Sequence, residues 1–114
     1  MSINEFLASA KKTIDKKSQV TEADIEDTFC KFAKRNKCNA LKLVFLRKKG
    51  FPDRTVLCPN GRVLFIEFKR NGKPLSPAQV LVKVMLTGFG FEYHVCDRIG
   101  QAENILGDFL VFDS

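Results

Sequence analysis

The sequence predicts an α/β domain in which a small mixed β-sheet is flanked by helices. Three observations predict this class. The chain has 114 residues, 45% hydrophobic and 28% charged, which suits one folded domain with a single core. Segments with apolar residues at helical spacing are interspersed with strand-like runs. Asn60-Gly61 separates two of those runs, which is typical of a β-hairpin and excludes a purely parallel sheet.

The first two elements are predicted to be helices. Residues 2–14 place their apolar side chains on one helical face and are followed by a polar stretch. We therefore divide the chain into an amphipathic helix with its linker, residues 1–19, and a folded domain, residues 20–114. This first helix is a candidate dimer contact. The second helix begins at Thr21, with Asp24 completing a capping-box pattern, and ends in a basic turn that suits the helix dipole.

Four segments are predicted to be strands. Residues 40–46 are apolar and strand-like, and residues 54–58 form the first arm of the hairpin. The return arm, residues 62–69, alternates its side chains between two faces. Residues 91–96 alternate in the same way and predict a strand after the next helix.

Two further helices follow from local signals. Ser76-Pro77 is typical of an N-cap followed by proline at the first helical position, so a helix is expected over residues 77–87. A final helix is expected over residues 101–108. The short tail, residues 109–112, is a candidate last strand.

The basic charge is concentrated in the middle of the chain. The net charge is +6, but residues 31–73 hold 13 lysines and arginines and only two acids, a net of +11. Both flanking segments are acidic. A solvated surface is the alternative interpretation of any one basic cluster. The polarised distribution favours a surface that contacts the phosphates of a nucleic acid.

The only two acids in this basic segment are Asp53 and Glu67. Glu67 and Lys69 are two positions apart on one strand and project from the same face. Asp53 begins the partner arm of the hairpin, so the two carboxylates can approach each other. Close carboxylates repel each other unless a proton or cation intervenes, and Mg²⁺ or Mn²⁺ prefers such oxygen ligands. The pattern therefore predicts metal-assisted phosphodiester hydrolysis, with Lys69 as the catalytic cation or base and Glu26 as a further ligand.

These residues resemble a known nuclease motif. Gly50-x-Pro52-Asp53 followed by Glu67-Phe68-Lys69 is similar to the PD-(D/E)xK nuclease superfamily. With Glu26 before it and Gln79 after it, the chain resembles a stand-alone VRR-NUC domain of the phage or prokaryotic type. The resemblance covers about residues 20–97.

The resemblance implies a restriction-endonuclease-like core, with a site built from two overlapping sets of residues. The implied metal ligands are Glu26, Asp53, Glu67 and the backbone carbonyl of Phe68. The implied catalytic residues are Asp53, Glu67, Lys69 and Gln79. Four alternatives from the residues stay open: Glu67 and Lys69 as a solvated strand face, Glu26 as a surface acid, Asp53 as a turn residue, and Gln79 as the partner of Ser76 in a capping box.

The expected function is a Mg²⁺- or Mn²⁺-dependent endonuclease that cuts branched DNA in the manner of a Holliday-junction resolvase, as a homodimer. A flap or nicking nuclease is one alternative, and a basic DNA-binding module without catalysis is another. Phe51, just before the acid, is a further residue to consider for DNA contact. The candidate phosphate contacts are Arg47, Lys48, Lys49, Arg54, Arg70 and Lys73.

Two classes of protein are excluded by the sequence. No run of 18 apolar residues is present, so a transmembrane helix and a membrane partner are not expected. The first residues lack the charged-then-apolar order of a signal peptide, so we expect the protein in the cytoplasm, or in the host cytoplasm if it is phage-encoded. Its four cysteines show no close-paired spacing that would predict a structural zinc site.

Overall fold

The computed structural model describes residues 2–7, 20–70 and 72–111. Its sheet has the strand order β1-β2-β3-β4, with the first three strands antiparallel and β4 parallel to β3. This arrangement confirms the predicted mixed sheet and α/β class. In chain order the elements are α2 (Glu22–Arg35), β1 (Asn39–Leu41), β2 (Arg54–Cys58), a 3-10 turn (Pro59–Gly61), β3 (Arg62–Phe68), α3 (Pro77–Gly88), β4 (Glu92–Cys96) and α4 (Gln101–Val111).

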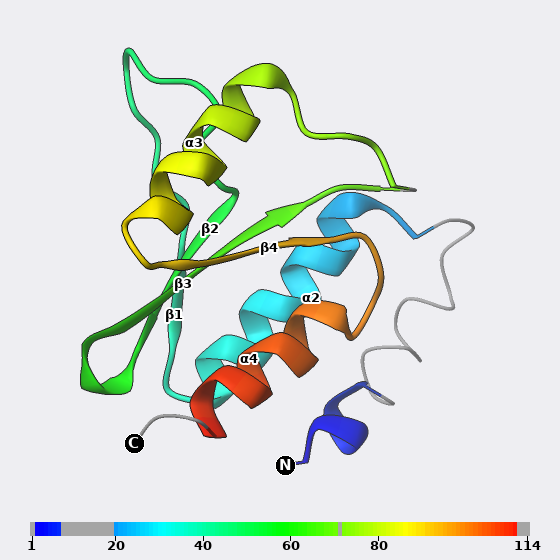
Figure 1. The fold of residues 1–114 in the computed structure, drawn as a ribbon. Coiled ribbons are helices and arrows are strands. Elements are labelled where there is room, and N and C mark those ends of the chain that lie inside the picture. Colours follow the sequence, from blue (N-terminus) through cyan, green and yellow to red (C-terminus); the bar gives the residue numbers. More distant parts are fainter. Residues whose placement is uncertain (1, 8–19, 71, 112–114) are drawn as a thin grey trace.

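Helices cover both faces of the sheet. Figure 1 shows α2 and α4 together on one face and α3 on the other. The alternation of β3 explains this arrangement, because Leu64, Ile66 and Phe68 join the core under α2 and α4. Phe65 points the opposite way and packs with Val82 of α3. The third strand therefore supplies both layers, and its residues from Leu64 to Phe68 are buried whichever way they point.

The β2–β3 hairpin forms where it was predicted. Its turn contains Asn60 with φ of 65° and Gly61 with φ of 72°, the left-handed conformation that these two residue types tolerate best. The register pairs Cys58 with Arg62 next to the turn and Arg54 with Ile66 at the open end. This register decides which residues meet beyond the end of β2.

Both predicted helix starts are present with their caps. The Thr21 hydroxyl accepts a hydrogen bond from the Asp24 amide, and the Asp24 carboxylate accepts one from the Thr21 amide. Ser76 and Gln79 form the same reciprocal pair at the start of α3. Each box satisfies amide groups that the first helical turn leaves without partners.

The strand predicted over residues 40–46 is much shorter, because β1 ends at Leu41. Leu41 pairs with Thr55, and β2 begins one residue earlier, at Arg54. The two residues before it offer no further ladder: Pro52 has no amide hydrogen, and the Asp53 amide donates to a side chain instead. The apolar residues after Leu41 therefore lie in an exposed loop.

The candidate last strand over residues 109–112 is also wrong for the part that is described. Helix α4 continues to Val111, and residue 112 lies outside the described residues. Ala102, Leu106 and Phe109 keep helical spacing and are all buried in the core beside α2. Burial of Phe109 on this face extends the helix past the predicted end.

The described part of the N-terminal segment packs on its own domain. Residues 3–7 are helical, and Phe6 is buried with its ring 5.2 Å from that of Phe32. The remainder of the predicted helix and the linker to residue 19 lie outside the described residues. In the described ranges, no helix is both long and apolar enough to cross a membrane.

Candidate active site

The structure brings Asp53 and Glu67 together at the open end of the hairpin. Because Arg54, the first residue of β2, pairs with Ile66, the preceding residue Asp53 falls opposite Glu67. The Asp53 amide donates a hydrogen bond of 3.2 Å to Oε1 of Glu67, and the Phe68 amide donates one of 2.8 Å to Oδ2 of Asp53. Each strand thus holds the carboxylate of the other in place.

Gln79 and Lys69 approach the same carboxylate from two sides. Nε2 of Gln79 donates a 3.0 Å hydrogen bond to Oε2 of Glu67, and Nζ of Lys69 lies 3.8 Å from that oxygen. The side-chain oxygen of Gln79, Oε1, accepts a 2.8 Å hydrogen bond from the backbone amide of Ser76 in the capping box. Gln79 therefore makes both of the contacts that the sequence left open, one to the helix start and one to the acid.

Burial and a neighbouring charge alter the acidity of this cluster. Only 3% of Glu67 is exposed. Loss of hydration, and next the charge of Asp53, raise the pKa of Glu67 to about 7. Lys69 acts in the opposite direction, because its positive charge favours the ionised carboxylate. The two acids are thus held close together with incomplete charge compensation, an arrangement typical of functional sites.

Glu26 does not join Asp53 and Glu67 in this structure but pairs with Arg54. Its Oε2 lies 2.6 Å from Nε of Arg54, and the guanidinium also donates to the carbonyl of Ala40. Arg54 points toward α2, like its cross-strand partner Ile66, whereas Glu67 points toward α3. Among the described residues, no three His, Cys, Asp or Glu side chains form a group suited to a metal ion. The proposed ligand Glu26 and the proposed phosphate contact Arg54 are thus engaged with each other.

The N-terminal end of α3 is fitted closely against the loop that carries the acid. Gly50 has φ of 89°, and a methyl group on it would lie 2.5 Å from the carbonyl carbon of Ala78 and 2.8 Å from the Gln79 nitrogen. Pro52 is buried on the same segment. The Gly-x-Pro-Asp sequence therefore has a steric role, since it allows Gln79 to come within reach of Glu67.

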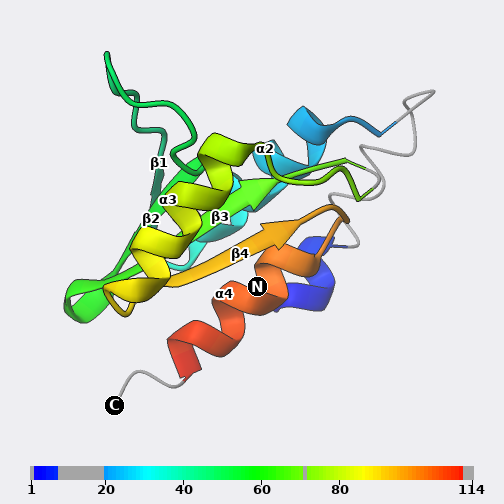
Figure 2. The ribbon, with the colours of Figure 1, turned by 45° about the horizontal axis from the view of Figure 1, so that its top comes forward.

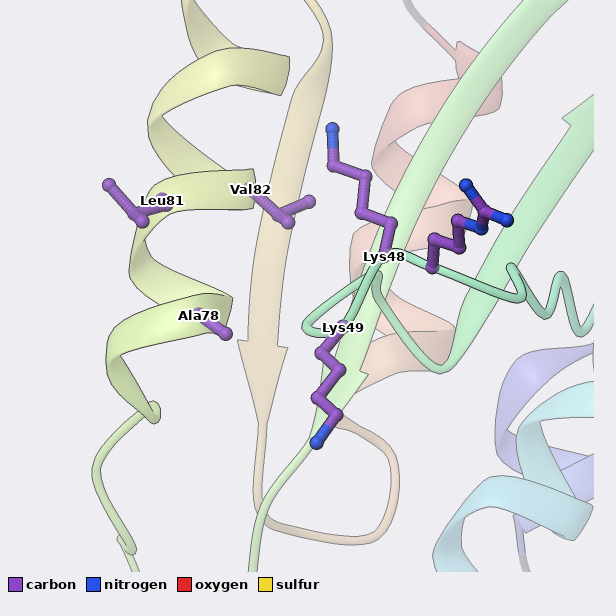
Figure 3. Close-up of a pocket in the computed structure, with 6 residues that line it drawn as sticks. Lys48, Lys49, Ala78, Leu81 and Val82 are labelled. Atoms are coloured by element: carbon purple, nitrogen blue, oxygen red, sulfur yellow. The ribbon is translucent and has the colours of Figure 1, made fainter.

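Three of the predicted phosphate contacts line one cleft. Arg47, Lys48 and Lys49 face Ala78, Leu81 and Val82 of α3 across a space of about 370 Å³. Figure 3 shows Lys48 and Lys49 leaving the loop in opposite directions. Lys48 reaches Sδ of Met85 on α3 at 3.4 Å. Lys73 is exposed, and Arg70 is half-buried near the end of β3.

Tyr93 is a neighbour of the site that the sequence did not single out. It pairs with Phe65 in the β3–β4 ladder and packs in the layer under α3. Burial and the charges of Glu67 and Asp53 raise the pKa of its hydroxyl. The hydroxyl has no hydrogen-bond partner within the described residues. Strand alternation places it on this face, but only the parallel pairing of β3 with β4 brings it near the acids.

Fold and site together define a class of protein: a small α/β domain whose paired acids and lysine meet at one end of a mixed sheet, beside a helix N-terminus. Residues 11–98 match the VRR-NUC domain family, so the chain belongs to this family. This finding confirms the predicted family. The match begins within residues 1–19, before the segment on which the resemblance was based.

Two relatives illustrate the similarity. The chain is 36% identical over 58 residues to a protein named "Putative nuclease p44" of Acyrthosiphon pisum secondary endosymbiont phage 1, and this alignment covers 51% of the chain and 62% of that relative. A solved "VRR_NUC domain" structure superposes with a TM-score of 0.71 at 19% identity, covering 77% of this chain and 96% of the other. At that identity the structural match supports the fold alone, and it confirms the predicted architecture.

Proposed function

We propose that this protein is a metal-dependent DNA endonuclease that hydrolyses phosphodiester bonds in branched DNA, in the manner of a Holliday-junction resolvase. The observation that carries the proposal is the contact between Asp53 and Glu67, with Lys69 and Gln79 on the same carboxylate. Membership of the VRR-NUC family and the similarity to a phage protein named as a nuclease support it.

The residues at this site fit a hard divalent cation. Asp53 and Glu67 supply carboxylate oxygens side by side, and their mutual repulsion is what a cation relieves. Mg²⁺ keeps several waters and is commonly bound by only one or two carboxylates, so two protein acids suffice. The proposed ligands are therefore Asp53, Glu67 and the carbonyl of Phe68. Glu26 joins them only if it leaves Arg54.

The bound ion, Mg²⁺ or Mn²⁺, supplies charge neutralisation at the phosphate and a more acidic water. The protein groups orient this chemistry. Gln79 holds one oxygen of Glu67 and so fixes the direction of the carboxylate. Lys69 is half-buried beside Glu67 and can hold or remove a proton of the attacking water, or stabilise negative charge on the phosphate oxygens.

Charge and shape support branched DNA as the substrate. The basic middle segment provides contacts to phosphates, which carry affinity without reading sequence. A domain of this size has little further surface for base-specific contacts, so DNA shape is the feature we expect it to recognise. A homodimer would present two sites to opposed strands of a four-way junction, and twofold assemblies are the commonest.

The test of this function is a Lys69→Ala variant assayed on a panel of four-way junction, flap, splayed arm, duplex and single strand, with Mg²⁺, with Mn²⁺ and with EDTA. We expect the wild type to cut the junction fastest and to stop in EDTA. Lys69→Ala should lower the cleavage rate by about 100-fold or more, while junction affinity stays within about threefold.

Arg98→Ala is the matched control, because it removes one exposed cation that lies outside the basic segment of residues 31–73. It should leave cleavage unchanged. Preferential cutting of flaps, or nicking of duplex, would contradict the junction preference and favour those alternatives. Absence of cleavage with either metal, together with DNA binding, would favour a non-catalytic binding module.

A further inference from the structure

The loop between β1 and β2 exposes apolar side chains that the fold does not use. It projects beyond the sheet beside α3 (Figures 1 and 2). We call residues 42–49 the apolar loop. Val44 is 82% exposed and Leu46 is fully exposed, with a relative exposure of 103%. With Leu43 and Phe45 they form a run of four consecutive apolar residues, each at least 38% exposed. Contiguous exposed apolar patches typically mark binding sites.

The apolar loop is fixed at its base rather than free along its whole length. The Phe45 ring lies 4.9 Å from that of Phe51, and Phe51 lies 5.6 Å from Phe65 on β3, both edge-on. Gly50 fits against the start of α3. Phe51, considered above for DNA contact, instead packs between two rings. Phe45 therefore anchors the loop, which leaves Val44 and Leu46 exposed.

Charge identifies the partner of this surface. The apolar loop carries four cations, Lys42, Arg47, Lys48 and Lys49, and no acid. Three of these line the cleft beside α3 (Figure 3). A second copy paired symmetrically through this loop would bring eight like charges together, which opposes association. A polyanion with exposed apolar faces complements both the cations and the exposed apolar side chains of the loop. DNA with unstacked bases is such a ligand.

We infer that the apolar loop is a wedge for the branch point, with Val44 and Leu46 inserted against unstacked bases and Arg47, Lys48 and Lys49 on the flanking phosphates. This inference rests on the proposed function and deepens it, since it names the residues that select branched over linear DNA. Leu46 and Asp53 are seven residues apart in sequence, so they lie at most about 25 Å apart. Cleavage is therefore expected within roughly seven nucleotides of the branch point, at 3.4 Å per nucleotide.

The experiment uses a Val44→Ser/Leu46→Ser double variant of the full chain in EDTA. Affinities for a four-way junction and for linear duplex are measured together with the emission of 2-aminopurine placed at the branch point. The wild type should bind the junction more tightly and increase the emission by unstacking the base. The double variant should lose at least tenfold in junction affinity and lose the emission change, with duplex affinity within twofold of wild type.

Val111→Ser is the matched control. Val111 is 76% exposed at the end of α4, a helix on the face of the sheet opposite α3. It undergoes the same valine-to-serine change as Val44. It should behave as wild type. Thermal unfolding of each variant checks that all three proteins are folded, and sedimentation velocity reports their association state.

The outcomes separate this inference from the proposed function. Wild-type junction preference that persists in the double variant overturns the wedge alone. If the wild type prefers the junction and changes the 2-aminopurine emission but does not cut with Mg²⁺ or Mn²⁺, the proposed nuclease activity is overturned and the wedge stays supported. A wild type without junction preference overturns both. If the double variant changes from dimer to monomer and its DNA binding is otherwise unchanged, the apolar loop is a contact with a second copy of the chain. That result overturns the wedge.

Discussion

At the scale of single residues, Gln79 has two contacts that are usually made by different side chains. Its amide oxygen caps α3, and its amide nitrogen holds Glu67. The sequence predicts the two contacts separately, because capping depends on Ser76 three residues away and a place at the site is implied only by the resemblance. One side chain makes both contacts because α3 approaches the sheet closely.

Gln79→Glu separates the two roles. The variant keeps an acceptor for the Ser76 amide but replaces the donor to Glu67 with a third negative charge. We expect cleavage to fall by about tenfold or more, about 1.4 kcal/mol in activation free energy. Ser76→Ala removes the other half of the capping box and should cost about 1 kcal/mol of stability with cleavage within threefold. Equal losses of cleavage in both variants would contradict the claim that cleavage depends on the contact of Gln79 with Glu67 and not on the helix cap.

At the scale of elements, the position of α3 depends on Gly50, the first residue of the Gly-x-Pro-Asp motif. Gly50 is the point where the loop touches Ala78 and Gln79. The sequence predicts each helix and each hairpin arm from signals within a few residues. It misplaces the end of β1, since that end depends on Pro52 and Asp53, which are ten or more residues further along the chain.

Gly50→Ala tests this contact. Its Cβ would overlap the backbone of α3, and its positive φ adds strain, so we expect a loss of at least about 2 kcal/mol in unfolding free energy. Gly61→Ala is the matched control, because Gly61 has φ of 72° but nothing within 4 Å of the added methyl. It should lose only about 1 kcal/mol. Chemical denaturation measures both, and similar losses would show that the contact with α3 is unimportant.

At the scale of the whole molecule, the two faces of the sheet have different uses. The face under α2 and α4 holds the larger core, while the face under α3 holds Glu67 and Tyr93 with a smaller apolar cluster.

One acid lies on the core side instead: Glu103 of α4 is only 1% exposed, and its Oε2 has no partner within the described residues. Burial raises the pKa of this carboxyl above its ordinary value.

Glu103 makes the stability of the whole domain depend on pH. Because its pKa is higher in the folded state, the folded protein binds more protons than the unfolded chain between the ordinary and the raised value. Stability should therefore decrease as pH rises through that window. Glu103→Gln should unfold at a higher temperature than wild type at pH 8 and lose part of the pH dependence. Exposed Glu5→Gln is the control, and a Glu103→Gln protein that is less stable at pH 8 would contradict this account.

The sequence by itself determined the helix starts, the Asn60-Gly61 turn and the register that sets Asp53 opposite Glu67. These features follow from hydrogen bonds and alternation over short stretches of chain, where local residues decide the outcome. The tertiary structure decided where β1 ends, how far α4 extends, that Glu26 pairs with Arg54, and that Val44 and Leu46 are left exposed. Each of these depends on which distant element supplies a partner, because strand pairing and burial are properties of the packed chain.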